Sequence, residues 1–134
     1  AFPHGWSEGQ AVFNGVHEAV HVYKVKGRDE YHMIYELNSG GVRSFGLARA
    51  SHLAGPWEKV TDAYATGSQL ICAPGVTRWT DIVSHGEVIR SGYDERLEYN
   101  ADSPVLLIQG RPDDAGSTPY PSLPWKLGLI TREK

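Results

Sequence analysis

The sequence predicts an all-β fold with no substantial helix, and three observations support this class. Short runs rich in β-branched and aromatic residues alternate with turn residues along most of the chain. The 134 residues include 15 Gly and 8 Pro, which favours frequent turns over long helices. No stretch of ten residues or more has the apolar spacing of an amphipathic helix. Hairpins of similar size joined by longer loops suit propeller blades or a sandwich, and periodicity alone does not separate these two architectures.

Seven stretches have the composition of strands, and the segments between them have that of turns or loops. Gly27-Arg28-Asp29 predicts the turn of a first hairpin, and residues 38–41 predict the next turn. Three longer loops are expected at 61–78, 92–102 and 111–124. The expected strands are 16–25, 31–37, 42–50, 57–60, 81–91, 103–110 and 125–132.

Composition narrows the classes of protein. The length suits one domain or part of one, here taken as a single partial domain over residues 1–134. A net charge of -3 without a basic stripe argues against a nucleic-acid partner. No window reaches 18 uninterrupted apolar residues, so no membrane span or membrane partner is expected. Cys72 is the only cysteine, so no disulfide forms within one chain, and we expect its side chain to be buried.

The segment His17-Glu18-Ala19-Val20-His21 matches the H-E-x-x-H signature of zinc metalloproteases. That signature requires a helix, in which two histidines four residues apart share one face and one metal ion. The flanking valines favour a strand, where the two histidines would lie roughly 13 Å apart. A zinc site is therefore disfavoured.

Glu18 is an unusual residue for a strand as apolar as this one. Its carboxylate either faces solvent or lies in a pocket where desolvation raises its pKa, as a general acid requires. The pattern alone leaves both interpretations open.

A second polar group, Ser84-His85-Gly86, interrupts an apolar run. His85 could be a hydrogen-bonded core residue or a ligand. Strand alternation predicts that Asp81, His85 and Glu87 share one face.

Aromatic residues lie next to Gly, Pro or Arg at several predicted loops. Rings in such places either stack on sugar faces or close the bases of loops, and both interpretations stay open. The residues are Trp6, Trp57, Trp79, Tyr93, Tyr120 and Trp125.

Colinear fragments along almost the whole chain resemble glycoside hydrolase family 62, the α-L-arabinofuranosidases. Residues 17–25, HEAVHVYKV, are similar to the family's F-E-A-V-x-V-Y-K-V segment. The other fragments are Phe2-Pro3-His4-Gly5-Trp6, Arg43-Ser44-Phe45, Gly55-Pro56-Trp57, Trp79-Thr80, Ser84-His85-Gly86, Gln109-Gly110 and residues 123–131.

The resemblance implies a five-bladed β-propeller that removes arabinofuranose side chains from arabinoxylan with inversion, and a secreted protein. It implies Glu18 as general acid and His85 beside a cation, often calcium, in the propeller channel. Trp125 takes the place of an aromatic residue at the sugar site, and Trp79 and Gln109 are further candidates for substrate binding.

The chain resembles only the C-terminal half of that family, about two to three blades. The family's general base and the second Asp that tunes the acid precede the F-E-A segment and have no counterpart here. Half a propeller leaves open sheet edges, so we expect self-association or a companion N-terminal fragment. The alternatives are a non-catalytic carbohydrate-binding or assembly module and a plain structural fragment.

Overall fold

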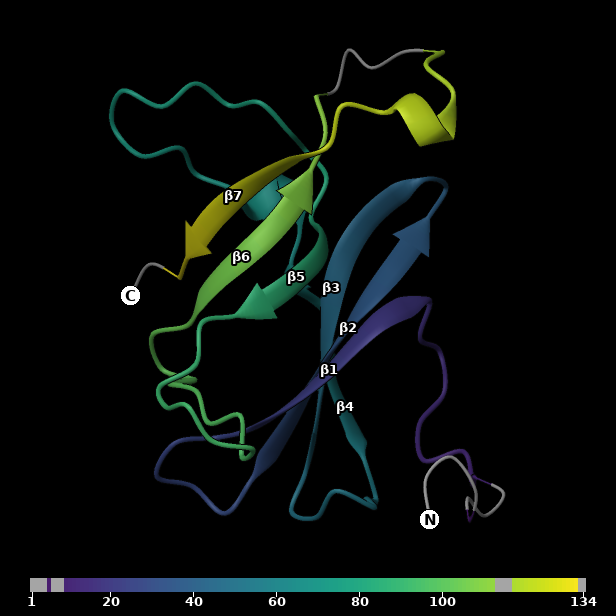
Figure 1. Cartoon of the computed structure of the whole chain (residues 1–134), viewed down its shortest axis with the longest axis vertical. Coiled ribbons are helices and arrows are strands. Elements are labelled where there is room, and N and C mark those ends of the chain that lie inside the picture. Colours follow the sequence, from purple (N-terminus) through teal and green to yellow (C-terminus); the bar gives the residue numbers. More distant parts are fainter. Residues whose placement is uncertain (1–4, 6–8, 113–116, 133–134) are drawn as a thin grey trace.

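The computed structural model describes residues 5, 9–112 and 117–132, and it confirms the all-β prediction (Figure 1). Within these residues the chain forms two antiparallel sheets, and the helical elements are two short 3-10 turns, η1 (Gly67–Gln69) and η3 (Tyr120–Ser122). No helix in the described part of the chain is long and apolar enough to cross a membrane. The strands are β1 (Glu18–Lys24), β2 (Tyr31–Ser39), β3 (Val42–Ala50), β4 (Glu58–Ala65), β5 (Ser84–Val88), β6 (Val105–Gly110) and β7 (Lys126–Thr131).

The first sheet is a meander in the order β1-β2-β3-β4. β2 and β3 pair without a break from Tyr31↔Ala50 to Ser39↔Val42, joined by the Gly40-Gly41 turn. Both glycines have a positive φ, which a tight hairpin turn requires. β2 is buried from His32 to Glu36, so both faces of this strand are covered and its side chains are fixed in place.

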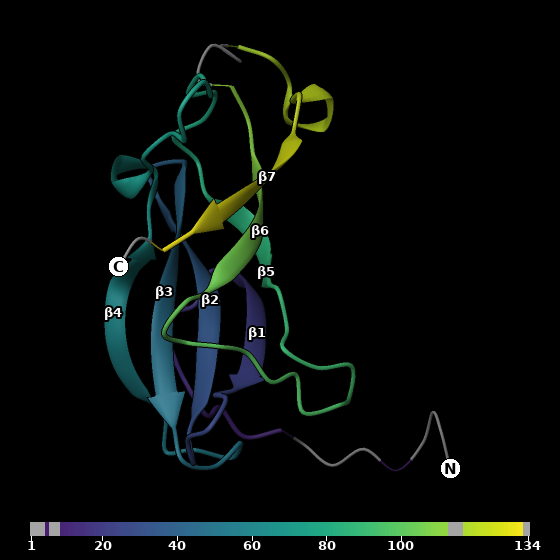
Figure 2. The same cartoon turned by 90° about the vertical axis from the view of Figure 1, so that its left-hand side faces the viewer.

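The second sheet is a shorter meander in the order β5-β6-β7. It packs on the first sheet, and the two turned views show the sheets as separate layers (Figures 1 and 2). The main core fills the space between them. Its buried residues are Tyr23, Val25, Ile34, Phe45, Leu47, Val83, Val88, Tyr99, Leu106 and Ile108.

Three predicted strand ends differ by three residues or more, one of them the end of β5, which lies at Val88 and not at residue 91. β4 extends to Ala65, beyond the expected end at residue 60, because Tyr64 and Ala65 pack against the main core. β5 begins at Ser84 and not at Asp81, because the Thr80 hydroxyl bonds both the N–H and the C=O of Ile82 and bends the chain there. The Phe2 to Trp6 fragment lies outside the described residues except for Gly5.

A buried polar chain joins the first sheet to the 92–102 connection. His32 Nε2 lies 2.7 Å from Glu30 Oε1, and His32 Nδ1 lies 2.5 Å from the Tyr99 hydroxyl. Tyr99 also exchanges backbone hydrogen bonds with Lys24 and Lys26 at the end of β1. Burial is the main cause that lowers the pKa of His32, against the opposing effect of the Glu30 carboxylate. His32 is therefore held neutral in the folded protein.

We expect the stability of the chain to fall as the pH drops below about 6.5, the usual pKa of histidine. The pKa of His32 is lower in the folded protein than in the unfolded chain, so as the pH falls the unfolded chain is protonated first. Protonation then favours the unfolded chain, and the folded protein has its full stability only above about pH 6.5. Urea unfolding at pH 7.5 and 5.5 measures the effect. His32→Gln should reduce the pH dependence, whereas the same change at exposed His52 should leave it unaltered.

Candidate active site

Glu18 stands at the start of β1, where the strand is irregular. Pairing with β2 is interrupted between Glu18 and His21, and Ala19 has a φ of 50°. A non-glycine residue in this left-handed region is strained, and such residues often lie at functional sites. The bulge presents the Glu18 carboxylate, 38% exposed, beside the second sheet.

Glu36, directly opposite Glu18 in the neighbouring strand β2, is fully buried. Its Oε2 accepts hydrogen bonds from the Ser84 hydroxyl at 2.9 Å and from the His85 N–H at 2.8 Å. Its Oε1 accepts a hydrogen bond from Arg43 Nη1. This carboxylate therefore joins β2, β3 and β5 at one point.

Arg43, from the start of β3, lies between the two carboxylates. The same nitrogen, Nη1, donates to Glu36 Oε1 and to Glu18 Oε1, and the side chain is 13% exposed. Because Glu36 is enclosed while Glu18 is partly exposed, Glu18 is the partner with freedom to move. Arg43 is consequently a fixed cation that forms an ion pair with the Glu18 carboxylate.

His85 completes the cluster from β5. Its φ of 33° is in the left-handed region, and β5 is irregular between Ser84 and Glu87. The ring Nδ1 lies 2.9 Å from the Ser84 hydroxyl, and Nε2 lies 3.9 Å from Glu18 Oε2. The next residue is Gly86, and a larger residue would not fit there because its Cβ would lie 2.8 Å from the Phe45 ring. The side chain of His85 is 46% exposed, so His85 is not the enclosed core residue considered from the sequence.

Charge, and not burial, governs the ionisation of Glu18. The hydrogen bond from Arg43 is the largest cause that lowers the pKa of Glu18, and it outweighs a desolvation effect in the opposite direction. Glu18 is thus partly exposed but not simply solvated, and in this arrangement it is ionised at neutral pH. Neither environment considered from the sequence describes it, because the decisive neighbour is a cation from another strand.

The H-E-x-x-H segment is not a helix, as the flanking valines predicted. His17 precedes β1 and lies 3.5 Å from Glu18 Oε1, while His21 Nδ1 lies 3.3 Å from the Tyr23 hydroxyl. The expectation that Asp81, His85 and Glu87 share a face is wrong. Asp81 precedes the strand and pairs with Arg78, and Glu87 pairs with Arg90 beyond the irregularity in β5.

One group of potential metal ligands occurs in the described part of the chain: Glu18, Glu36 and His85, whose ligand atoms lie within 4.8 Å of one another. Calcium takes six to eight oxygen ligands. Here Arg43 already bonds both carboxylates, and His85 offers a nitrogen. By themselves these residues do not fit a calcium ion.

The three residues expected to bind substrate occupy different places. Gln109 lies opposite Ser84 in the β5–β6 pair, and Trp125 directly precedes Lys126, which pairs with Gly110. Both are therefore at the end of the second sheet where His85 is held. Trp79 packs against Gly128 and lines a groove beside β4 and β7, whose lining does not include Glu18.

Sequence reasoning assigned no role to Glu36 or Arg43. A carboxylate within the buried run Met33-Ile34-Tyr35-Glu36-Leu37 was the available signal, because a charge in such a strand needs a partner. Only the sheet register, with Glu36 opposite both Glu18 and Phe45, shows where that partner lies.

Comparison with known proteins identifies the family. The chain matches glycosyl hydrolase family 62 over residues 4–131. The chain belongs to this family. Alpha-L-arabinofuranosidase C of Cellvibrio japonicus is 36% identical over 121 residues, which is 87% of this chain and 19% of the relative.

Solved structures of the family show the same fold. The catalytic domain of a Coprinopsis cinerea family 62 α-L-arabinofuranosidase is 35% identical with a TM-score of 0.85, covering 97% of this chain and 43% of that one. A family 62 hydrolase in complex with xylotriose is 31% identical, with a TM-score of 0.86, and covers 98% and 44%. A Podospora anserina α-L-arabinofuranosidase in complex with cellotriose is 29% identical, with a TM-score of 0.86, and covers 99% and 44%.

The two sheets therefore correspond to part of a β-propeller. The chain spans less than half the length of these structural relatives, which agrees with the sequence prediction of a partial propeller.

Replacing Glu36 with Gln should destabilise the chain by about 3 kcal/mol, because it removes one partner of a buried ion pair. The new amide would also turn its NH2 group either to Arg43 or to the His85 N–H, and both of these are donors. Urea unfolding measures the loss. Glu58→Gln is the matched control: its pair with Arg49 is exposed, so the cost should stay below about 1 kcal/mol.

Removing the charge of Arg43 should raise the pKa of Glu18 toward its ordinary range. The double variant Arg43→Met with Glu36→Gln removes the buried charge together with its partner, so the fold should be better preserved than in the single variants. A carbon-detected NMR titration of the Glu18 carboxyl measures the change. Arg43→Lys keeps the charge and should keep the pKa low; an unchanged pKa in the double variant would contradict the assigned cause.

Proposed function

We propose that the chain is the acid-bearing part of an inverting α-L-arabinofuranosidase that removes arabinofuranose side chains from arabinoxylan. Glu18 is the general acid, which protonates the glycosidic oxygen as the bond to arabinose breaks. The observation that carries this proposal is the placement of Glu18. A strained bulge presents a partly exposed carboxylate beside the second blade, where Arg43 from β3 bonds it and His85 Nε2 from β5 lies 3.9 Å away.

The reaction also needs a carboxylate that can act as general base, and the only other carboxylate of this cluster is Glu36. An inverting glycosidase places its general base about 6.5–9.5 Å from the acid, with room for the attacking water. Glu36 cannot be that base, because it is fully buried and accepts hydrogen bonds from Ser84, His85 and Arg43. We therefore propose that the base comes from the part of the propeller that this chain does not span.

The protonation state of Glu18 also requires a carboxylate from the rest of the propeller. Arg43 lowers the pKa of Glu18, whereas a general acid must carry its proton at the working pH. A carboxylate supplied near Glu18 by the rest of the propeller would disfavour its ionised form and raise that pKa. Completion of the ring would thus supply both the base and the charge that prepares the acid.

The expected sugar-binding residues, the calcium ion and the location of the protein are part of the same proposal. Gln109 and Trp125, at the end of the second sheet near His85, would contact the sugar, while Trp79 lies in a different groove. A calcium ion in the channel would need oxygen ligands beyond those of this cluster, with His85 at its margin. Action outside the cell fits the family and its polysaccharide substrate.

A carbohydrate-binding or assembly module is the second candidate. Its support is the ionised state of Glu18 in this chain together with the absence of an inverting partner in the described cluster. Xylotriose and cellotriose in the relatives' structures favour an oligosaccharide ligand for either candidate.

Arabinose release from arabinoxylan separates the candidates. The chain should be inactive alone and active after assembly with the unmatched remainder of the Coprinopsis cinerea catalytic domain. In that assembly Glu18→Gln should lower kcat by about 10²–10⁴-fold, the contribution of a general acid, and calorimetry should show that xylo-oligosaccharide binding is retained.

Glu87→Gln is the matched control, because Glu87 is an exposed carboxylate on β5 that pairs with Arg90. Its activity should equal that of the unmodified assembly. Full activity of the Glu18→Gln assembly would refute the acid role. Oligosaccharide binding by an assembly that never releases arabinose would favour the binding module.

A further inference from the structure

The side chains of β2 that face the second sheet are polar at both ends and apolar between them. His32, Ile34 and Glu36 share this face by strand alternation, and all three are buried. Ile34 belongs to the main core. His32 and Glu36 are four residues apart, about 13 Å along the strand. Each polar end makes its own connection from the first sheet to a later part of the chain.

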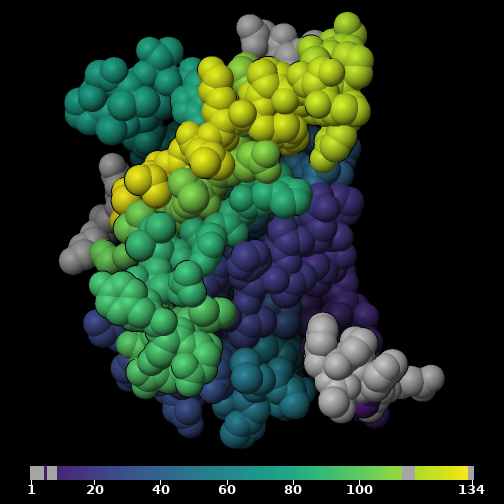
Figure 3. All heavy atoms as spheres, in the orientation of Figure 1, coloured from purple at the N-terminus to yellow at the C-terminus, as the bar shows by residue number. Residues whose placement is uncertain are grey.

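The 92–102 connection lies against the first sheet at the His32 end. The Tyr99 N–H donates to the Lys24 carbonyl, and the Lys26 N–H donates to the Tyr99 carbonyl. The space-filling view shows this connection, in green, at the surface beside the first sheet (Figure 3). Through its hydroxyl, Tyr99 also joins the connection to the buried His32 ring.

The positions of the protons in this polar chain follow from its first member. The Glu30 carboxylate can only accept a hydrogen bond, so His32 Nε2 carries a proton and donates it to Glu30. The other nitrogen of a neutral imidazole is an acceptor. The Tyr99 hydroxyl therefore donates to His32 Nδ1, and its oxygen is left to accept.

Tyr64 of β4 is the last member of the chain. Its buried hydroxyl makes no standard hydrogen bond within the described residues. Burial raises the pKa of Tyr64 and of Tyr99; beyond burial, Tyr64 raises the pKa of Tyr99 and Tyr99 lowers that of Tyr64, so the two hydroxyls are close. A hydroxyl rotates to suit its neighbours, so the Tyr64 O–H can turn to the Tyr99 oxygen. Every proton of the neutral chain then has an acceptor.

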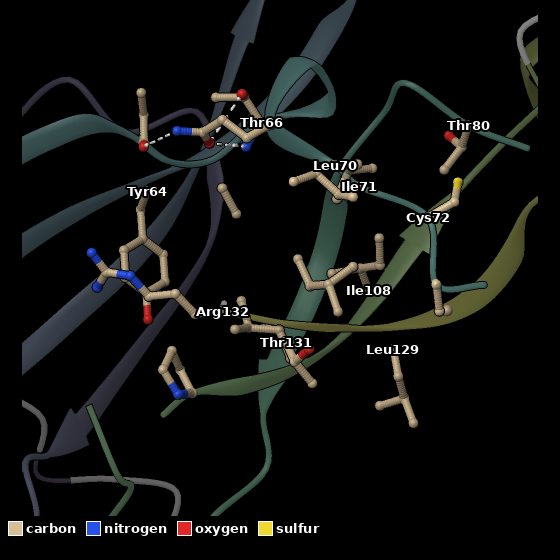
Figure 4. Close-up of a pocket in the computed structure, with 18 of the residues that line it drawn as sticks. Tyr64, Thr66, Leu70, Ile71, Cys72, Thr80, Ile108, Leu129, Thr131 and Arg132 are labelled. Atoms are coloured by element: carbon tan, nitrogen blue, oxygen red, sulfur yellow. Dashed lines mark hydrogen bonds between the residues drawn. The ribbon is translucent and has the colours of Figure 1, made fainter. Parts of the chain in front are cut away.

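Tyr64 also lines an apolar groove between β4 and β7 (Figure 4). Cys72 lines the same groove, and the expectation that it is buried is wrong, because its side chain is exposed. The groove side of Tyr64 is lined mostly by apolar residues and offers its hydroxyl no printed partner within the described residues.

A proton added to His32 gives this chain one donor too many. Nδ1 then donates to the Tyr99 oxygen, and the Tyr99 hydroxyl must turn to the Tyr64 oxygen. The Tyr64 O–H is left without an acceptor in the described part of the chain. A buried donor without an acceptor is costly, and so is a charged ring at a position as buried as that of His32. Opening to water removes both costs.

The charges around His32 do not remove this penalty. Burial lowers the pKa of His32 most, Glu30 raises it, and Arg28 and Arg49 lower it further. The two arginines form exposed ion pairs with Asp102 and Glu58. The titratable and charged groups that face His32 are Tyr23 from β1, Arg28 and Glu30 from the turn before β2, Arg49 from β3, Tyr64 from β4 and Tyr99 from the 92–102 connection.

The Glu36 end of β2 lacks this sensitivity to protons. Its donors are Arg43, the Ser84 hydroxyl and the His85 N–H, and all three keep their protons between pH 7.5 and 5.5. The His85 ring Nδ1 lies 3.3 Å from Glu36 Oε2, so a proton gained by that ring would add a donor beside an acceptor. The sheets therefore stay joined at this end as the pH falls.

We propose that His32 and Tyr99 form a pH-operated latch: below neutral pH, protonation of His32 releases Tyr99 and lets the 92–102 connection open from the first sheet, while Glu36 keeps the two sheets joined at the other end. The opening is local and precedes global unfolding. It does not rest on Glu18, so the latch and the proposed reaction stand or fall separately.

Hydrogen exchange of the chain at pH 7.5 and 5.5 tests the latch. Rates are expressed as protection factors, which removes the intrinsic effect of pH on exchange. The Lys26 and Tyr99 amides should lose up to about tenfold in protection, the limit for one proton taken up by a histidine of ordinary pKa about 6.5. The His85 amide, bonded to Glu36, and the Val83 amide, bonded to the Arg43 carbonyl, should keep theirs.

Two variants separate the members of the latch. His32→Gln stays neutral, and its amide can donate to Glu30 and accept from Tyr99, so the Lys26 amide should stay protected at both pH values. Tyr99→Phe removes the hydroxyl, so protection of the Lys26 amide should already be low at pH 7.5. His52→Gln, at an exposed position, is the matched control and should keep the response of the unmodified chain. Protection of the His85 amide shows that each variant is folded.

Loss of protection at Lys26 and Tyr99 alone, abolished in His32→Gln, supports the latch. Equal loss at Lys26, Tyr99, Val83 and His85 means global unfolding and overturns it, as does constant protection of Lys26 and Tyr99 across the pH range. A full pH response in His32→Gln assigns the effect to another group and also overturns it. If His32→Gln does not fold, Tyr99→Phe decides: unchanged protection of Lys26 at pH 7.5 overturns the latch.

Discussion

The buried carboxylate of Glu36 is the constraint on which the candidate site depends. A charge removed from water is tolerated only when a counter-ion and hydrogen-bond donors replace its hydration. Glu36 obtains them from Arg43 on β3, from the Ser84 hydroxyl and from the His85 N–H at the start of β5. The first sheet and the second sheet are consequently tied together at the point where the acid candidate stands.

That constraint explains features that otherwise look unfavourable. The left-handed conformation of His85 directs its N–H at Glu36, and the bond to Oε2 helps to offset the strain. Gly86 then lets the chain pass close to Phe45. Arg43, bound to Glu36, cannot follow Glu18 if that side chain moves. The site thus combines a rigid base of Glu36, Arg43 and Ser84 with one adaptable carboxylate.

The sequence predicts much of the fold because strand signals are local. The β2–β3 hairpin is marked by its β-branched and aromatic residues and by the Gly40-Gly41 turn, and the structure has it in nearly the expected place. The end of β4 and the start of β5 were misplaced because they depend on packing against the core and on the hydroxyl of Thr80. The packing at the end of β4 joins segments far apart in the sequence, which no local pattern records, and the bend at Thr80 is a side-chain hydrogen bond that strand composition does not reveal.

The candidate site, like the fold, could be predicted from the sequence only in part. Glu18 and His85 could be found from short motifs, and the structure brings them to within 3.9 Å. Arg43 could not be assigned its role, because its importance arises from cross-strand register and not from its neighbours in sequence. The alternation that placed Asp81, His85 and Glu87 together failed because it assumes a regular strand, and β5 is irregular where His85 lies.

In the proposed function the acid and the base come from distant parts of one propeller chain, and the charges around Glu18 give a physical reason for that division. With Arg43 beside it Glu18 stays ionised at neutral pH, so these blades alone would hold the proposed proton donor in its unprotonated state. An added carboxylate repels the Glu18 anion and shifts the proton onto it. Because the family resemblance implies a second Asp, distinct from the general base, that tunes the acid, closing the ring would supply both the base and the carboxylate that raises the pKa of Glu18. Under the proposed function, catalysis would depend on assembly through the charges around Glu18, while Glu36 fixes Arg43, the cation that bonds Glu18.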